Sequence, residues 1–189
     1  GVAYGKDKWV AVGDDSTGYG SIMYSTDGTS WTQTSTGASF SAYGFGVAYG
    51  KDKWVTVGDD STGYGSIMYS TDGVSWTKTS TGASFSTYGR GVAYGNDRWV
   101  AVGDGNADGN NYGHIMYSTD GVSWTKTSTG ASFSSPGYRV AYGKDRWVAV
   151  GNDGGDDYGH IMYSTDGMCW TQTSTGASFS DSGYGVAYG

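Results

Sequence analysis

The residues best suited to chemistry are tyrosines, arginines and amides in two sets of glycine-rich connections. One set spans 13–20, 58–65, 103–113 and 151–159, and the other spans 42–46, 87–91, 135–139 and 181–185. Aromatic faces beside hydrogen-bonding groups can stack on a sugar ring and bond its hydroxyls. The candidate ligand-binding residues are Tyr19, Tyr64, Tyr112, Tyr158, Tyr43, Tyr88, Tyr138, Tyr184, Arg90, Arg139 and Asn111.

One connection carries a pattern suited to a metal ion. Asp104, Asn106 and Asp108 place oxygen atoms at alternate positions before a glycine, which resembles the start of a calcium loop. The twelfth position is Ile115, where an EF-hand has glutamate. Calcium is therefore the single cofactor that the pattern suggests, and the alternative is a polar turn with no cofactor at all.

The composition favours strands as the elements that position these residues. The chain has 35 Gly, 17 Tyr and 8 Trp but no Leu and no Glu, which is a poor supply for helices. Its net charge of −7 argues against a nucleic-acid partner or an anionic membrane surface. No apolar run is long enough to span a bilayer. We therefore expect an all-β protein.

The chain is a tandem repeat. The segment GVAYG, or RVAYG in one copy, begins at Gly1, Gly46, Gly91, Arg139 and Gly185, with spacings of 45, 45, 48 and 46 residues. Periods of this size are typical of stacked or circular arrays, in which each repeat buries its apolar faces against its neighbours. We predict one repeat domain, 1–189, with units 1–45, 46–90, 91–138 and 139–184 and an extra strand at 185–189.

Each repeat contains four short apolar stretches separated by turn residues. In the first repeat we predict strands at 2–4, 8–12, 21–25 and 30–34. The second and third stretches are apolar on both faces, so both sides of the sheet should be covered, whereas the fourth alternates like an outer edge. Four strands per repeat, covered by neighbouring repeats, describe the blade of a β-propeller.

The turn between the third and fourth strands is repeated four times. Ser25-Thr-Asp27-Gly28-Thr-Ser-Trp31 resembles the Asp-box repeat of bacterial propellers, sialidases and sortilin-like proteins, in a shortened form where Gly follows Asp directly. The aspartate is expected to accept backbone N–H groups and the tryptophan to fill the blade. These structural positions are Asp27, Asp72, Asp120, Asp166, Trp31, Trp76, Trp124 and Trp170.

The resemblance to sialidases also sets a test for catalysis. A sialidase-like enzyme would need an arginine cluster for the substrate carboxylate and a tyrosine nucleophile with a glutamate partner. The chain has no glutamate, and Arg90 and Arg139 alone belong to the variable connections. We therefore expect no catalytic residues and no enzyme, with a sialidase-like glycoside hydrolase as the alternative, because a glycosidase could use two aspartates instead.

The repeats differ chiefly in the two sets of connections, which an antiparallel blade places on one face. Variable loops on a rigid scaffold are typical of a recognition surface, although neutral drift also gives such variation. We expect a non-enzymatic structural or adhesive protein, secreted or displayed at the cell surface, whose partner is a glycan or a surface protein. A protein-binding scaffold is one alternative. In another, an open array forms a filament when 185–189 adds to a neighbouring molecule.

Overall fold

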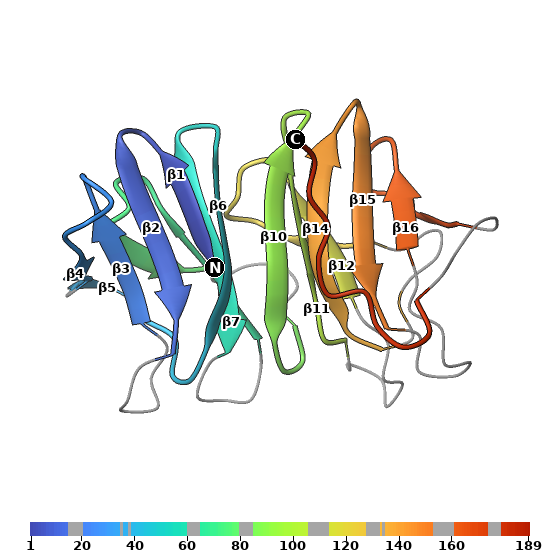
Figure 1. Ribbon diagram of the computed structural model, residues 1–189, viewed down its shortest axis with the longest axis horizontal. Helices are drawn as coiled ribbons and strands as arrows, with labels where there is room; N and C mark the ends of the chain where they lie inside the picture. The colour runs from blue at the N-terminus through green and yellow to red at the C-terminus, as the bar shows by residue number, and fades with distance from the viewer. Residues whose placement is uncertain are drawn as a thin grey trace.

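The structure is a computed structural model that places four antiparallel sheets next to one another (Figure 1). It describes residues 1–14, 21–34, 36–37, 39–59, 65–79, 85–105, 114–127, 133, 135–152, 161–173 and 179–189. The described residues include strands and turns, and none of them belongs to a helix that could cross a membrane. The all-β prediction is confirmed.

Each sheet is formed mainly by one repeat, and we call it a blade. Blade 1 contains β1 (Val2–Gly5), β2 (Lys8–Gly13), β3 (Ser21–Ser25) and β4 (Thr32–Gln33). Blade 2 contains β6 (Gly44–Gly50), β7 (Lys53–Asp59), β8 (Gly65–Ser70) and β9 (Ser75–Lys78). Blade 3 contains β10 (Gly89–Gly95), β11 (Arg98–Gly103), β12 (His114–Ser118) and β13 (Thr125–Lys126). Blade 4 contains β14 (Gly137–Gly143), β15 (Arg146–Gly151), β16 (Ile161–Ser164) and β17 (Thr171–Gln172).

The first strand of each blade lies innermost. β1 packs on β6, β6 on β10 and β10 on β14, and the other strands of each blade extend outward from them (Figure 1). The short strand β5 (Thr36–Gly37) adds to the outer edge of blade 2, parallel to β9. Beyond blade 4, the segment 185–189 lies against β14, because the ring of Tyr188 covers Gly143 as that of Tyr142 covers Gly95.

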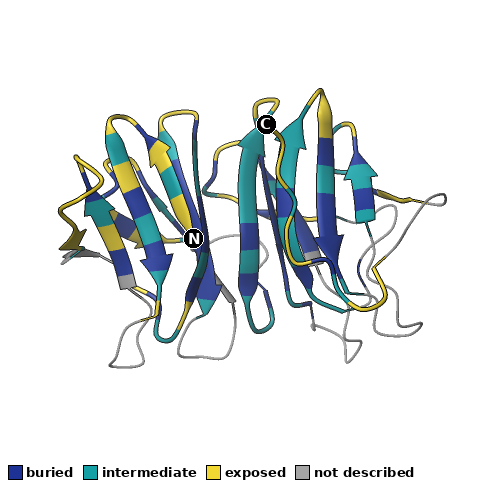
Figure 2. Ribbon diagram, in the orientation of Figure 1, coloured by how far each residue is buried: buried dark blue, intermediate teal, exposed yellow. Residues whose placement is uncertain are grey.

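The apolar core lies between the blades rather than inside one of them. At the boundary of blades 2 and 3, Val55, Val57 and Phe85 of blade 2 meet Trp99 and Met116 of blade 3, and all five are fully buried. The other two boundaries repeat this arrangement. The two apolar faces predicted for the second strand are therefore explained by one neighbouring blade on each side (Figure 2).

A two-residue turn joins each innermost strand to the next one. In blade 2 the turn residues Lys51 and Asp52 have φ angles of 48° and 55°, and the hydroxyl of Tyr49 donates to Oδ1 of Asp52 at 3.3 Å. Positive φ at both central positions matches the right-handed twist of the flanking strands. This turn fixes the register between the first and second strands of the blade. That register places the apolar residues of the second strand against the neighbouring blades.

The repeated Ser-Thr-Asp-Gly turn is closed by its own side chains. In blade 2, Oδ1 of Asp72 accepts the N–H groups of Val74 and Ser75 at 2.8 Å each and the hydroxyl of Ser70 at 2.9 Å. Oγ of Ser70 in turn accepts the N–H of Gly73 at 2.8 Å, and Gly73 has a φ of 73°. The aspartate thus satisfies backbone donors that the tight turn leaves without strand partners.

The tryptophan that follows this turn points toward the preceding blade. Trp76, Trp124 and Trp170 are each 2% exposed, because the blade before them covers the ring. Trp31 of blade 1 is 39% exposed, although its sequence surroundings are nearly the same. The tryptophan therefore fills the space between two blades rather than the blade that carries it.

The turn aspartates predict a loss of stability in acid. Partial burial raises the pKa of Asp72, but hydrogen bonds from Ser75, Val74 and Ser70 outweigh it and lower the pKa from 3.8 to about 2. Because the folded-state pKa is depressed, this stabilisation is present above pH 3.8 and is lost as the pH falls toward 2. We expect the free energy of unfolding, measured by urea titration, to decrease over this interval.

The matched variant for this prediction is Asp72→Asn, whose side-chain oxygen still accepts N–H groups but carries no proton to titrate. It is expected to be less stable than the parent at neutral pH and to converge with it near pH 2. A difference between the two proteins that stays constant from pH 5 to pH 2 would contradict the assignment.

Candidate functional site

The candidate site lies where the innermost strands of blades 2, 3 and 4 begin, and a β-bulge shapes each of these three places. In blade 2, Gly44 pairs with Gly58 and Gly46 pairs with Val57, so Phe45 is an extra residue on its strand. A bulge turns the extra side chain out of the regular alternation, which is why bulges recur beside binding sites. The equivalent extra residues of the next two blades are Arg90 and Tyr138.

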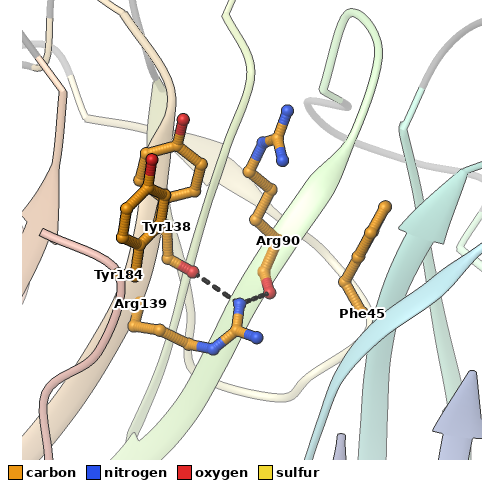
Figure 3. Close-up of a pocket in the computed structure, with 5 residues that line it drawn as sticks. All are labelled: Phe45, Arg90, Tyr138, Arg139 and Tyr184. Atoms are coloured by element: carbon orange, nitrogen blue, oxygen red, sulfur yellow. Dashed lines mark hydrogen bonds between the residues drawn. The ribbon is translucent and has the colours of Figure 1, made fainter. Parts of the chain in front are cut away.

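These residues converge on one pocket of about 270 Å³ (Figure 3). Phe45, Arg90, Tyr138 and Tyr184 occupy the same place in successive repeats, and Arg139 stands where the other repeats have glycine. The pocket is therefore built from the positions at which the repeats differ. The same position in four repeats supplies one phenylalanine, one arginine and two tyrosines to a single site.

Arg90 is held in place by four neighbouring side chains. Its Nε and Nη2 donate to the two carboxylate oxygens of Asp104 at 2.5 and 3.1 Å. Its guanidinium carbon lies 5.1 Å from the ring centres of Tyr88 and Tyr138 and 5.8 Å from that of Phe45. A bidentate ion pair and three cation–π contacts fix the orientation of this charged side chain.

Arg139 is the second cation of the pocket. Its Nη1 donates to the backbone oxygens of Arg90 and Tyr138 at 2.6 and 2.8 Å (Figure 3). Burial, and then the positive charge of Arg90, lower the pKa of Arg139. Within the described part of the chain, no carboxylate pairs with it. A ligand that accepts hydrogen bonds or carries negative charge would stabilise this guanidinium.

The aromatic side of the pocket is partly open to solvent. The rings of Tyr138 and Tyr184 lie 4.9 Å apart between centres at an angle of 49°, and Tyr184 is 66% exposed. On the other flank, Tyr43 and Tyr88 make an edge-to-face pair at 6.5 Å. Such rings offer apolar faces and a hydroxyl at the rim.

The structure brings together six of the residues proposed from the sequence. The ends of the two sets of connections lie together, since the N–H groups of Asp59 and Asp104 donate to the carbonyl oxygens of Tyr43 and Tyr88 at 2.7 and 2.8 Å. The six residues are Tyr43, Tyr88, Tyr138, Tyr184, Arg90 and Arg139. The remaining candidates, Tyr19, Tyr64, Tyr112, Tyr158 and Asn111, lie outside the described residues.

The calcium prediction stays open. Both carboxylate oxygens of Asp104 bond to Arg90, while Asn106 and Asp108 lie outside the described residues. In the part of the chain that the structure describes, no group of three or more His, Cys, Asp or Glu side chains could hold a metal ion. If calcium binds at this connection, it competes with Arg90 for the carboxylate of Asp104.

Phe45 is the pocket residue that reasoning from sequence did not include. In the sequence alone, a single phenylalanine before a strand is expected to be a buried residue of the apolar core. The alignment of the repeats contains the signal, because Phe45 occupies the same position as Arg90, Tyr138 and Tyr184. Asp104 was predicted as a metal ligand, and its pairing with Arg90 depends on a neighbouring strand that sequence spacing does not reveal.

Comparison with known protein families and with curated proteins finds no match to this chain. Solved structures do resemble it. Hadza microbial sialidase Hz136 has a TM-score of 0.61 and 15% identity, over 92% of this chain and 45% of its own. Trypanosoma rangeli sialidase in complex with 2,3-difluoro-KDN has a TM-score of 0.61 and 14% identity, over 90% and 36%. YCF48 bound to D1 peptide has a TM-score of 0.53 and 16% identity, over 95% and 52%.

These similarities establish the fold. The chain is a β-propeller of four blades, and two of the structures that it resembles are sialidases. At identities of 14–16% the resemblance transfers no activity. The chain spans about half of the length of YCF48 or Hz136 and about a third of the Trypanosoma rangeli sialidase.

Proposed function

We propose that this protein is a non-enzymatic carbohydrate-binding module that acts in a structural or adhesive role outside the cell. The pocket of Phe45, Arg90, Tyr138, Arg139 and Tyr184 carries the proposal, because positions that vary among the repeats meet in one concave site. A site made from drift alone has no reason to combine adjacent aromatic rings with a partly buried cation. The connections on the same face extend this surface.

The chemistry of the pocket suits a sugar. The faces of Tyr138 and Tyr184 can pack on the apolar side of a pyranose ring, while Arg139 donates to its hydroxyls or to a carboxylate. Its volume of about 270 Å³ is just below the range of about 300–1,000 Å³ typical of drug-sized ligands. One residue of a longer glycan therefore fits, with the remainder of the glycan on the open face.

The side chains of the pocket also support a binding role without catalysis. Glycoside hydrolysis ordinarily uses two carboxyl groups that flank the scissile bond. The five residues that line the pocket include none, and the neighbouring carboxylate of Asp104 bonds to Arg90 through both oxygens. Turnover of fluorogenic α-sialosides or β-glycosides by the purified protein would contradict the non-enzymatic assignment.

The test is a glycan array followed by calorimetry with the best neutral and acidic hits. Tyr184→Ala and Arg139→Gly are expected to lower the affinity by about tenfold or more, because each removes a principal contact. Arg139→Gly restores the residue found in the other repeats, and Tyr184 is 66% exposed, so neither change removes core packing.

Lys126→Ala is the matched control. Lys126 is exposed on the outer strand β13, and its removal changes the net charge as Arg139→Gly does. Affinity should stay at the parental level in this variant. The absence of binding across a broad array, or equal losses in all three variants, would remove the proposed function.

A further inference from the structure

The three boundaries between blades are built from the same two complementary faces. We call one of them the forward face; in blade 2 it includes Val55, Val57, Ile67 and Phe85. The backward face of the following blade presents a tyrosine, two tryptophans and a methionine at equivalent positions. In blade 3 these backward-face residues are Tyr94, Trp99, Met116 and Trp124. Boundaries 1/2 and 3/4 repeat both sets.

The backward face of blade 1 is uncovered. Tyr4, Trp9, Met23 and Trp31 are 54%, 38%, 39% and 39% exposed, whereas Trp99, Met116 and Trp124 of blade 3 are at most 2% exposed. Figure 2 shows the exposed segments along β1 and β2 beside the buried strands of the inner blades. Contiguous apolar residues of this size on a surface mark an interaction site.

The forward face of blade 4 is only partly covered. Phe179 is 40% exposed, although its equivalents Phe40, Phe85 and Phe133 are fully buried. The cover that exists comes from the segment 185–189, whose Tyr188 lies on Gly143. That segment reads GVAYG, the same five residues as β1 with its preceding Gly1.

The polar rim of the two faces is complementary as well. Inside the chain, Nζ of Lys8 donates to the carbonyl oxygen of Asp72 in the next blade at 2.9 Å, and Lys53 donates to Asp120 in the same way at 3.0 Å. Arg146 occupies the equivalent position in blade 4. It would bond in the same way to the carbonyl oxygen of Asp27 if blade 1 of another copy followed blade 4. Arg146 is exposed, and among the described residues the atoms nearest to a Cβ at Gly28, in the turn at Asp27, all belong to Trp9, whereas those at Gly73 and Gly121 include a lysine atom.

We propose that two copies of this chain associate head to tail, with the backward face of blade 1 in one copy on the forward face of blade 4 in the other. β1 of the incoming copy takes the position of 185–189. The exchange replaces one GVAYG strand with an identical one. The net gain is the burial of Trp9, Met23, Trp31 and Phe179, together with the new rim contact of Arg146.

This inference does not rest on the proposed carbohydrate binding, and the association uses two different patches of one chain. Such a heterologous contact either closes into a ring or continues into a filament, according to the rotation between copies. The same contact geometry occurs three times inside the chain, between faces built from residues equivalent to those of the two uncovered faces. The occupant of both faces is therefore a second copy.

Sedimentation velocity of the 189-residue chain over a wide concentration range tests the inference. The expected result is a concentration-dependent increase to dimers or larger species. Tyr4 and Tyr188 occupy the same position in the two GVAYG segments, and their substitution is expected to have opposite effects on association. Tyr4→Ala removes a docking residue and should weaken association by about tenfold or more. Tyr188→Ala loosens the competing segment 185–189 and should strengthen association.

Controls separate this contact from misfolding and from sugar binding. Met23→Lys should abolish association, whereas Thr125→Lys, the same kind of change on the exposed outer strand β13, should leave it intact. Circular dichroism and urea midpoints establish that each variant is folded. Arg139→Gly should lose sugar affinity yet still associate. A parent protein that stays monomeric at all concentrations, or a parallel response of Tyr4→Ala and Tyr188→Ala, would overturn the inference.

Discussion

Replacing Trp99 with alanine is expected to lower the free energy of unfolding by about 3–5 kcal/mol. Trp99 is fully buried at the boundary of blades 2 and 3, and its ring lies 4.9 Å from that of Tyr94. The substitution removes one of the two largest side chains of this boundary and leaves a cavity that two rigid sheets cannot close. Because each blade is stabilised mainly by its neighbours, the loss also weakens the coupling between the two halves of the chain.

Trp9 provides the matched comparison. It occupies the same position in blade 1 and contacts Tyr4 at the same ring distance of 4.9 Å, but it is 38% exposed because no blade covers it. Trp9→Ala should therefore cost roughly 1–2 kcal/mol, in proportion to the smaller apolar area removed from water. The difference between the two variants measures what a neighbouring blade contributes.

Urea unfolding monitored by far-UV circular dichroism checks this prediction at a protein concentration where the chain is monomeric. Trp99→Phe, which keeps most of the apolar volume, should recover much of the loss. Equal costs for Trp9→Ala and Trp99→Ala would show that the tryptophan stabilises its own blade, and that the boundary between blades contributes little.

The repeat pattern predicted the architecture because strand and turn signals are local. The predicted strand at 8–12 corresponds to β2 (Lys8–Gly13), and that at 21–25 coincides with β3 (Ser21–Ser25). The predicted outer strand at 30–34 shortens to β4 (Thr32–Gln33), because the hydrogen bonds of the Ser-Thr-Asp-Gly turn take up the residues before it. The sequence does not distinguish the uncovered blade 1 from the covered blades, since burial depends on a neighbour rather than on the residues themselves.

The candidate site was predictable in outline but not in geometry. Variation among the repeats pointed to the strand starts, which is where Tyr138, Tyr184, Arg90 and Arg139 meet. The bulge that turns each extra residue into the pocket has no signature of its own, because it arises from pairing with the next strand. The bidentate contact of Arg90 with Asp104 joins residues 14 positions apart across two strands, beyond the reach of motif spacing.

Gly103→Ala is the second change for which we expect a large effect. A Cβ atom at Gly103 would lie 2.2 Å from the carbonyl oxygen of Tyr88 and 2.7 Å from the ring of Phe85. That carbonyl oxygen is fixed, since it accepts the N–H of Asp104 at 2.8 Å. The clash is therefore with backbone and with a buried ring, and relief requires the strand start that carries Arg90 to move. We expect a loss of about 3 kcal/mol, at the upper end of the cost of overpacking.

Gly13→Ala is its control within the same molecule. Val12-Gly13-Asp14 and Val102-Gly103-Asp104 are identical in sequence, yet a Cβ atom at Gly13 would meet no atom within 4 Å. Gly13→Ala should change the free energy of unfolding by less than about 0.5 kcal/mol, whereas Gly103→Ala should also weaken binding at the pocket through Arg90. Urea titration and calorimetry of both variants test this. The two positions differ because the connection that contains Phe85 and Tyr88 packs over Gly103 and has no counterpart at Gly13. Similar losses in the free energy of unfolding for the two variants would therefore mean that backbone freedom, and not this connection, sets the requirement for glycine.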